Sequence, residues 1–207
     1  MSLLEITDLS LSIHGAPILQ DVSLGIAPGE IHGVIGESGS GKSMTAFSVM
    51  QLLPEGALCS GAVMLDGADM LQAEEAQLCA LRGETVGMVF QEPMTALNPV
   101  MTIGAQVAET VLIHEDGTKA EALKRAQIAL ERCELPADKF PMSRFPHELS
   151  GGQRQRVVIA MAIALRPKLL IADEPTTALD VTTQAEILAL IRKLVDEDQM
   201  GVMFITH

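Results

Sequence analysis

A glycine-rich segment near the beginning of the chain has the residue types and spacing of a phosphate-binding loop. It fits the pattern GxxxxGK[ST], in which glycines let backbone N–H groups close around phosphate oxygens at the start of a helix. In this pattern Lys42 reaches the β and γ phosphates and Ser43 holds Mg²⁺. The alternative is a flexible Gly-Ser turn without a ligand. The predicted loop consists of Gly36, Glu37, Ser38, Gly39, Ser40, Gly41, Lys42 and Ser43.

Two adjacent acids, Asp173 and Glu174, follow the apolar run LLIA and predict a second part of the same site. At a strand end, Asp173 can accept a hydrogen bond from a water bound to Mg²⁺, and Glu174 can polarise an attacking water. The alternative is an exposed pair of acids that opens a turn before Pro175. The pair narrows the classes that a phosphate loop alone leaves open, which are ATPases, GTPases and small-molecule kinases.

A second serine- and glycine-rich segment predicts another anion site at the start of a helix. Ser150 has the position of a helix N-cap, and the glycines after it expose backbone N–H groups. The apolar run from Val157 to Leu165 continues the helix. A plain capping turn explains the serine and the glycines, but it does not explain two such anion sites in one acidic chain. The segment consists of Leu149, Ser150, Gly151, Gly152 and Gln153.

Strands that alternate with helices must position these residues, which predicts an α/β fold with a mostly parallel sheet and helices on its faces. Two runs of alternating apolar and polar residues between positions 9 and 26 predict an N-terminal antiparallel β-subdomain. A helical pattern after position 103 predicts an inserted helical subdomain. We expect one domain over 1–207, with a nucleotide-binding core in 1–97 and 166–207 and helices in about 98–165. The core should contain strands at 31–35, 86–90, 168–172 and 202–206 and helices at 42–53 and 182–195.

The composition limits the partners and the compartment. A formal net charge of -13 argues against a nucleic-acid partner, because such a surface requires clustered Lys and Arg. The three cysteines are far apart and match no metal-ligand spacing, so we expect reduced thiols without a disulfide or a metal cluster. The longest apolar run is shorter than the ~20 residues that span a bilayer, and the N-terminus lacks a secretory signal. These features predict a cytoplasmic protein.

Several motifs occur in an order that resembles an ATPase subunit of an ABC transporter. The resemblance covers essentially the whole chain and implies the P-loop NTPase fold, with ATP and Mg²⁺ as ligands. It also implies that two subunits pair head to tail, as a homodimer or a heterodimer, so that each ATP lies between one phosphate loop and the other subunit's LSGGQ. The motifs are GESGSGKS, Gln91, LSGGQ, LLIADE, the turn Ala178-Leu179-Asp180 and the final His207.

The resemblance also implies roles for individual residues. Gln91 would join the coordination of Mg²⁺ and sense the membrane partner, and Glu174 would be the catalytic base. Asp180 would lie in the turn that contacts the opposite subunit, and His207 would contact the γ-phosphate. The family usually presents an aromatic ring to adenine near the start of the chain. Here the candidate for stacking is His14, and a structural histidine in a strand turn is the equal alternative.

Finer resemblance, in residues 90–99 and 173–181, is to the importer branch for dipeptides, oligopeptides, nickel and glutathione. It implies a subunit that couples ATP hydrolysis to the import of peptides or a related small solute. The implied partners are transmembrane permease subunits and an extracytoplasmic solute-binding protein. The implied location is peripheral, on the cytoplasmic face of the inner or plasma membrane.

Two other functions stay open at this point. One is a soluble mechanical ATPase that acts on DNA or ribosomes, against which the dipeptide Thr177-Ala178 argues, since translation-factor relatives usually have Asn-His there. The other is a nonhydrolytic nucleotide-binding fragment. Relatives continue past the position of His207, so the resemblance leads us to expect a chain truncated at its C-terminal end.

Overall fold

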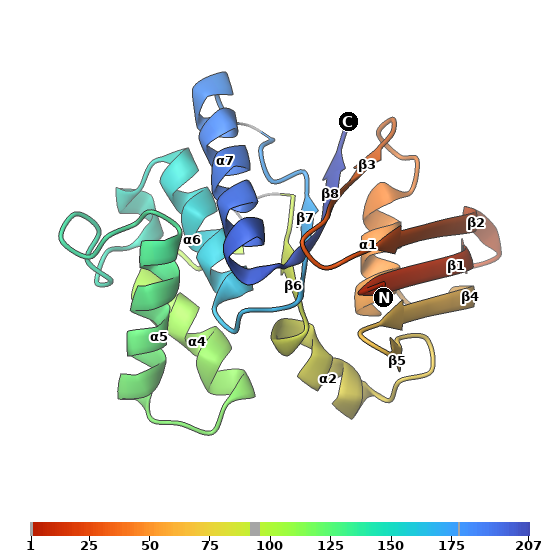
Figure 1. Ribbon diagram of the computed structural model, residues 1–207, viewed down its shortest axis with the longest axis horizontal. Helices are drawn as coiled ribbons and strands as arrows, with labels where there is room; N and C mark the ends of the chain where they lie inside the picture. The colour runs from red at the N-terminus through yellow and green to blue at the C-terminus, as the bar shows by residue number, and fades with distance from the viewer. Residues whose placement is uncertain (1, 92–95, 178) are drawn as a thin grey trace.

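The computed structural model describes residues 2–91, 96–177 and 179–207 (Figure 1). Residues 92–95 and Ala178, which carry part of the resemblance to importers, lie outside the described residues. The chain forms an antiparallel sheet and a parallel sheet, with most of the helices on the far side of the parallel sheet from the antiparallel one (Figure 1). Among the described residues, no helix combines the length and the apolar character needed to cross a bilayer.

The antiparallel sheet has the strand order β2-β1-β4-β5. Neighbouring strands pair antiparallel throughout, which confirms the prediction of an N-terminal antiparallel unit. The register of β1 shifts near Asp8, whose φ is 48°, so that the strand bulges there. The strands are β1 Leu4–Ile13, β2 Ala16–Ile26, β4 Ala57–Leu65 and β5 Ala68–Asp69.

The parallel sheet has the strand order β3-β8-β7-β6, and each neighbouring pair is parallel. All five residues of β7 are buried, because this inner strand is covered on both faces. The carboxyl ends of parallel strands meet at one edge of a sheet, so residues that follow β6, β7 and β8 become neighbours. The strands are β3 Ile31–Ile35, β6 Val86–Val89, β7 Leu169–Asp173 and β8 Gly201–Thr206.

The two faces of the parallel sheet belong to different hydrophobic clusters. On one face, Leu169, Ile171 and Met203 pack with α1 and the antiparallel sheet. On the other face, Leu170 and Val202 pack with buried residues of α4, α5, α6 and α7. The division of the chain at residues 97/98 and 165/166 stays a prediction. The helices are α1 Lys42–Met50, α2 Glu75–Glu84, α4 Ile103–His114, α5 Lys119–Arg132, α6 Gly151–Ile163, α7 Val181–Asp198 and the short 3-10 helix Pro146–Glu148.

Candidate nucleotide-binding site

The predicted phosphate loop lies between β3 and α1, and its glycines are required by its backbone. Gly39 has a φ of 83° and Gly41 a φ of 92°, in the left-handed region that residues with a side chain rarely adopt. A Cβ atom on Gly41 would also lie 2.6 Å from Leu19 Cδ2 of β2. Gly41 is the N-cap of α1 and supplies no side-chain cap, so the first N–H groups of this helix face the loop.

Lys42 places its charge inside this loop. Its side chain is buried, and Nζ donates hydrogen bonds to the carbonyl oxygens of Gly36 at 2.7 Å and Glu37 at 2.9 Å. A Cβ on Gly36 would lie 2.9 Å from Ser40 Oγ, so the loop closes tightly on itself. A buried ammonium group next to uncapped N–H groups can attract an anion, and phosphate binding by these residues stays a prediction.

Asp173 ends β7 and is only 2% exposed. Its Oδ1 has no hydrogen-bond partner among the described residues. Burial raises the pKa of Asp173, and the charge of Glu174 adds to this effect, while a hydrogen bond from Ser43 and the charge of Lys42 oppose it. A buried carboxylate with a vacant acceptor beside Ser43 is a suitable ligand for a small cation.

Glu174 follows directly and adopts a left-handed backbone conformation, with a φ of 48°. Its N–H donates to the carbonyl oxygen of Ile205 in β8 at 3.0 Å, which fixes the residue at the sheet edge. The side chain is 13% exposed, and its Oε2 atom is the meeting point of three side chains. Gln91 Nε2 donates to it at 3.0 Å, Thr177 Oγ1 donates at 3.0 Å, and His207 Nδ1 lies 3.6 Å away.

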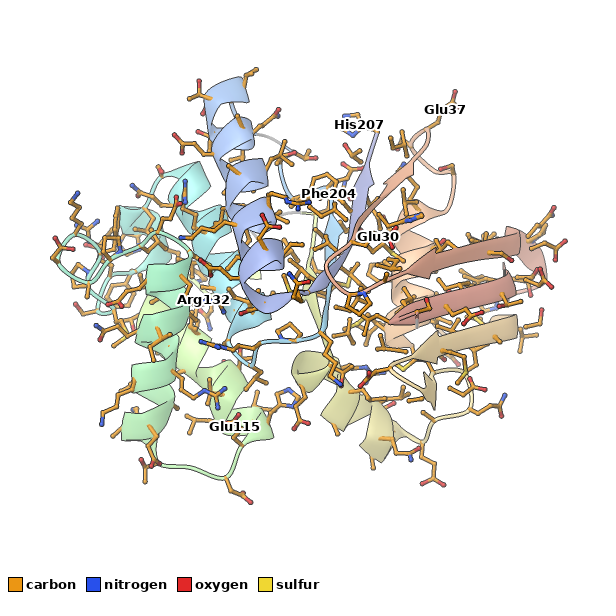
Figure 2. The ribbon with its side chains drawn as sticks, in the orientation of Figure 1. Glu30, Glu37, Glu115, Arg132, Phe204 and His207 are labelled. Carbon is orange, nitrogen blue, oxygen red and sulfur yellow. The ribbon has the colours of Figure 1, made fainter. Side chains whose placement is uncertain are left out.

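The structure therefore brings Gln91, Glu174 and His207 together from the ends of β6, β7 and β8. A carboxylate can only accept, so the amide of Gln91 must present Nε2 to Glu174, and its Oε1 is left as an acceptor for another group. Figure 2 shows His207 at the same end of the molecule as Glu37 of the phosphate loop. The predicted roles of these residues stay predictions, but their proximity is an observation.

Thr177 also belongs to this site, a position that its sequence motif does not predict. Its contact with Glu174 is local, because the N–H of Thr177 also donates to the carbonyl oxygen of Glu174 at 3.1 Å. The available signal was Pro175 at the second position of a four-residue turn that starts at Glu174. Such a turn places the side chains of its first and last residues on the same side of the chain.

The LSGGQ segment begins α6 as predicted, with Ser150 as the N-cap. The N–H of Gln153 donates to Ser150 Oγ at 3.3 Å, and the N–H of Ser150 donates to Gln153 Oε1 at 2.9 Å. A Cβ on Gly152 would lie 2.4 Å from Thr183 Cγ2 in α7, and one on Gly151 would lie 3.5 Å from a methyl of Leu179. The starts of α6 and α7 are therefore in contact.

Asp180 caps α7 in the same region. Its carboxylate accepts from the N–H of Thr183 at 3.0 Å and from Thr183 Oγ1 at 2.7 Å, and these hydrogen bonds lower the pKa of Asp180. The chain does not bring this region to its own phosphate loop, because α7 and the parallel sheet lie between the start of α6 and the loop after β3 (Figure 1).

His14 lies in the turn between β1 and β2 and is exposed, with a φ of 49°. Its N–H donates to the carbonyl oxygen of Gly56 at 3.1 Å, and its ring covers the position where Gly56 would carry a Cβ. The carbonyl oxygen of Ile18, four residues further on, lies 3.2 Å from the Cβ position of Gly41. The contact with the phosphate loop therefore belongs to Ile18 of β2, and the stacking role of His14 stays a prediction.

The fold and this site define a nucleotide-binding protein with a phosphate loop. A family model described as ABC transporter matches residues 19–177, and the chain belongs to this family. It is 50% identical over 211 residues to the peptidoglycan transport ATP-binding protein YejF of Agrobacterium fabrum, covering 99% of this chain and 39% of that protein. It is 46% identical over 211 residues to the oligopeptide transport ATP-binding protein OppD of Bacillus subtilis, covering 99% of this chain and 59% of that protein. The chain therefore spans less than two thirds of the length of each of these relatives.

Solved structures with the same fold confirm the predicted fold class. A dimeric post-hydrolysis state of the ATP-binding cassette MJ0796 with ADP and Pi has a TM-score of 0.82 and 32% identity, covering 99% of this chain and 88% of that chain. The protein cbiO1 from Clostridium perfringens, part of the ABC transporter complex cbiONQ, has a TM-score of 0.83 and 27% identity, covering 100% of this chain and 78% of that chain.

Proposed function

We propose that this chain is the ATP-hydrolysing, energy-coupling subunit of a membrane transporter that imports peptides or a related small solute. The observation that carries the proposal is the meeting of Gln91, Glu174 and His207 at the strand ends, next to Asp173. The relatives named for the transport of oligopeptides and peptidoglycan support the transport role and the class of cargo. The ADP- and Pi-bound cassette of the same fold supports ATP as the nucleotide.

The residues present fit a Mg²⁺ ion. Asp173 offers a buried Oδ1 without a partner among the described residues, Gln91 offers its Oε1, and Ser43 offers a hydroxyl beside Asp173. Carboxylate, amide and hydroxyl oxygens are the ligands that Mg²⁺ prefers. When bound, the ion would neutralise charge on the phosphates during transfer of the γ-phosphoryl group.

Residues of this chain would bind the phosphates, accept the proton from water and contact the γ-phosphate. Lys42 and the N–H groups at the start of α1 bind the β and γ phosphates. Glu174 is the base: its carboxylate accepts a proton from water as the water oxygen attacks the γ-phosphorus and the bond to ADP breaks. His207, beside Glu174, is placed to contact the γ-phosphate. The site excludes water only in part, since His207 is 67% exposed.

A second ATPase subunit completes the site in this proposal. The phosphate loop and the start of α6 lie on opposite sides of α7 and the parallel sheet, so one chain cannot close both around one ATP (Figure 1). A head-to-tail partner would bring its own Ser150, Gly151 and Gly152 over the phosphates held here. The dimeric cassette of the same fold supports this pairing, and the partner is an identical or a related subunit.

The permease would dock next to Gln91. A groove of about 380 Å³ lies beside the end of β6 and is lined mainly by apolar groups, including Phe90, Ala96 and Val158. Phe90 of this groove directly precedes Gln91 in the chain, so a partner in the groove would reach the base through the hydrogen bond between Gln91 and Glu174. The chain would then act at the cytoplasmic face of the membrane, with an extracytoplasmic solute-binding protein that delivers the cargo and without a nucleic-acid partner.

Replacing Glu174 with glutamine tests the proposal. In the full-length protein, Glu174→Gln should lower ATP turnover by about 100-fold or more while ATP binding is retained, because a general base contributes at least this much. Glu5→Gln, an exposed acid on β1, is the matched control and should keep wild-type turnover. Full hydrolysis by Glu174→Gln would show that the base has been misassigned. Copurification with ribosomes or DNA, in place of permease subunits, would contradict the transport role.

A further inference from the structure

We propose that Thr177 is a positioning residue that selects which oxygen of Glu174 takes the proton from water. In this view the Thr177 hydroxyl holds Oε2, so that Oε1 is the basic oxygen. The inference rests on the proposed function, in which Glu174 is the base.

The turn that follows β7 ties the two residues together by two hydrogen bonds. The N–H of Thr177 donates to the carbonyl oxygen of Glu174 at 3.1 Å, and Thr177 Oγ1 donates to Glu174 Oε2 at 3.0 Å. Pro175, at the second position, fixes φ and stiffens the turn. The carboxylate is therefore held by the same short segment that carries it.

The contacts of the carboxylate are unequal. A carboxylate oxygen has two lone-pair sites, and on Oε2 both are taken, by Gln91 Nε2 and Thr177 Oγ1. His207 adds a third polar neighbour to the same oxygen at 3.6 Å. No hydrogen bond from the described residues reaches Oε1. The hydrogen bonds stabilise the lone pairs of Oε2 and make this oxygen less basic than Oε1. The proton released by water therefore goes to Oε1.

Thr177 is the part of this arrangement that does not depend on another strand. Gln91 follows β6 and also faces the proposed metal and membrane partner, whereas Thr177 belongs to the turn of the base itself. The turn is further attached to α7, since Gln184 Nε2 donates to the carbonyl oxygens of Thr176 at 3.2 Å and Leu179 at 3.1 Å. Oε2 therefore keeps one donor when Gln91 moves to another ligand.

The neighbouring threonine provides a matched control. Thr176 lies in the same turn and is buried to a similar degree, but its hydroxyl makes no hydrogen bond with the part of the chain that is described. Thr177→Val removes the hydroxyl and keeps the shape of the side chain, while Thr177→Ser keeps the hydroxyl. Thr177→Ala is a second hydroxyl-free variant, in case valine distorts the turn.

The experiment compares steady-state ATP hydrolysis and ATP affinity of these variants in the full-length protein. Thr177→Val and Thr177→Ala should lower kcat by about 10- to 100-fold, which is the effect of losing a hydrogen bond to a charged group that orients a reacting atom. ATP affinity should not change, because the hydrogen bonds of Thr177 to described residues go to Glu174 and not to the phosphate loop. Thr177→Ser and Thr176→Val should keep a kcat near that of the wild type.

Two results would overturn the inference. One is wild-type kcat in Thr177→Val and Thr177→Ala, and the other is a loss in Thr177→Ser as large as that in Thr177→Val, which would assign the effect to packing of the methyl group. Glu174→Gln, measured in parallel, separates this failure from a failure of the proposed function. If Glu174→Gln is inactive and the Thr177 variants are fully active, only the inference about Thr177 fails.

Discussion

Replacing Asp173 with asparagine should stabilise the nucleotide-free protein, because the substitution removes a buried negative charge. The side chain is 2% exposed, and its Oδ1 has no hydrogen-bond partner among the described residues. Burial and the charge of Glu174 raise the pKa of Asp173 in spite of the hydrogen bond from Ser43 and the charge of Lys42. The ionised carboxylate is therefore less favourable in the folded chain than in the unfolded chain.

The sign of the pH dependence follows from the raised pKa. Below about pH 3, under the pKa of the unfolded carboxyl, Asp173 is protonated in both states and its burial carries no charge penalty. As the pH rises, the unfolded chain ionises first, so the penalty grows and is complete once the folded carboxyl has ionised. At pH 7 the Asp173→Asn substitution should increase the free energy of unfolding by about 1 kcal/mol. For a chain of this size, this raises the Tm by about 2–4 °C.

Thermal unfolding at pH 7 with a chelator and without nucleotide is the direct assay, repeated near pH 3, where the gain in Tm should disappear. Addition of Mg²⁺ and ATP should raise the Tm of the wild type more than that of Asp173→Asn. Asp180→Asn is the control of opposite sign, because hydrogen bonds from Thr183 lower the pKa of Asp180 and its neutralisation should give no gain. A lower Tm for Asp173→Asn at pH 7, or a gain of the same size at pH 3, would refute the reasoning.

Two further predictions concern packing and thiol chemistry. Gly152→Ala should destabilise the protein by about 1–2 kcal/mol, because the new Cβ would lie 2.4 Å from Thr183 Cγ2. This steric clash outweighs the better helix propensity of alanine. Adding Thr183→Ser removes Cγ2 and should restore the Tm. If the double variant is no more stable than Gly152→Ala, the clash is not the cause. Burial raises the pKa of the Cys133 thiol to about 12, so a thiol reagent at pH 8 should label the exposed Cys79 rapidly and Cys133 only after unfolding. Equal labelling rates in the folded protein would show that Cys133 is accessible.

The parts of the site that depend on neighbouring residues could be predicted from the sequence. The backbone conformation of the phosphate loop requires glycine at particular positions, which is a local property of the sequence. In the same way, Ser150 caps the helix that begins with the next residue. The alternation between positions 9 and 26 identified β1 and β2, two of the four antiparallel strands. It placed the start of β1 too late, because the bulge at Asp8 reverses the alternation between Leu4 and Leu9.

The contacts between distant segments could not be predicted in the same way. Gln91 and Glu174 are 83 positions apart and meet only because β6 and β7 are neighbours in the sheet order. The family resemblance supplied their roles, but no residue pattern supplies the order β3-β8-β7-β6. The contact between Gly152 and Thr183 was missed for the same reason, since it depends on how α6 and α7 pack.

The alignment of β6, β7 and β8 also bears on how proteins with this site can diverge. Strand pairing uses backbone groups, so the positions of Gln91, Glu174 and His207 are insensitive to which apolar side chains fill the core beneath them. Mutations can therefore accumulate on the outer surfaces of α4 and α5 without displacing Gln91, Glu174 or His207. A lineage can therefore change the surface of these helices while the relative positions of the three strand ends are inherited unchanged.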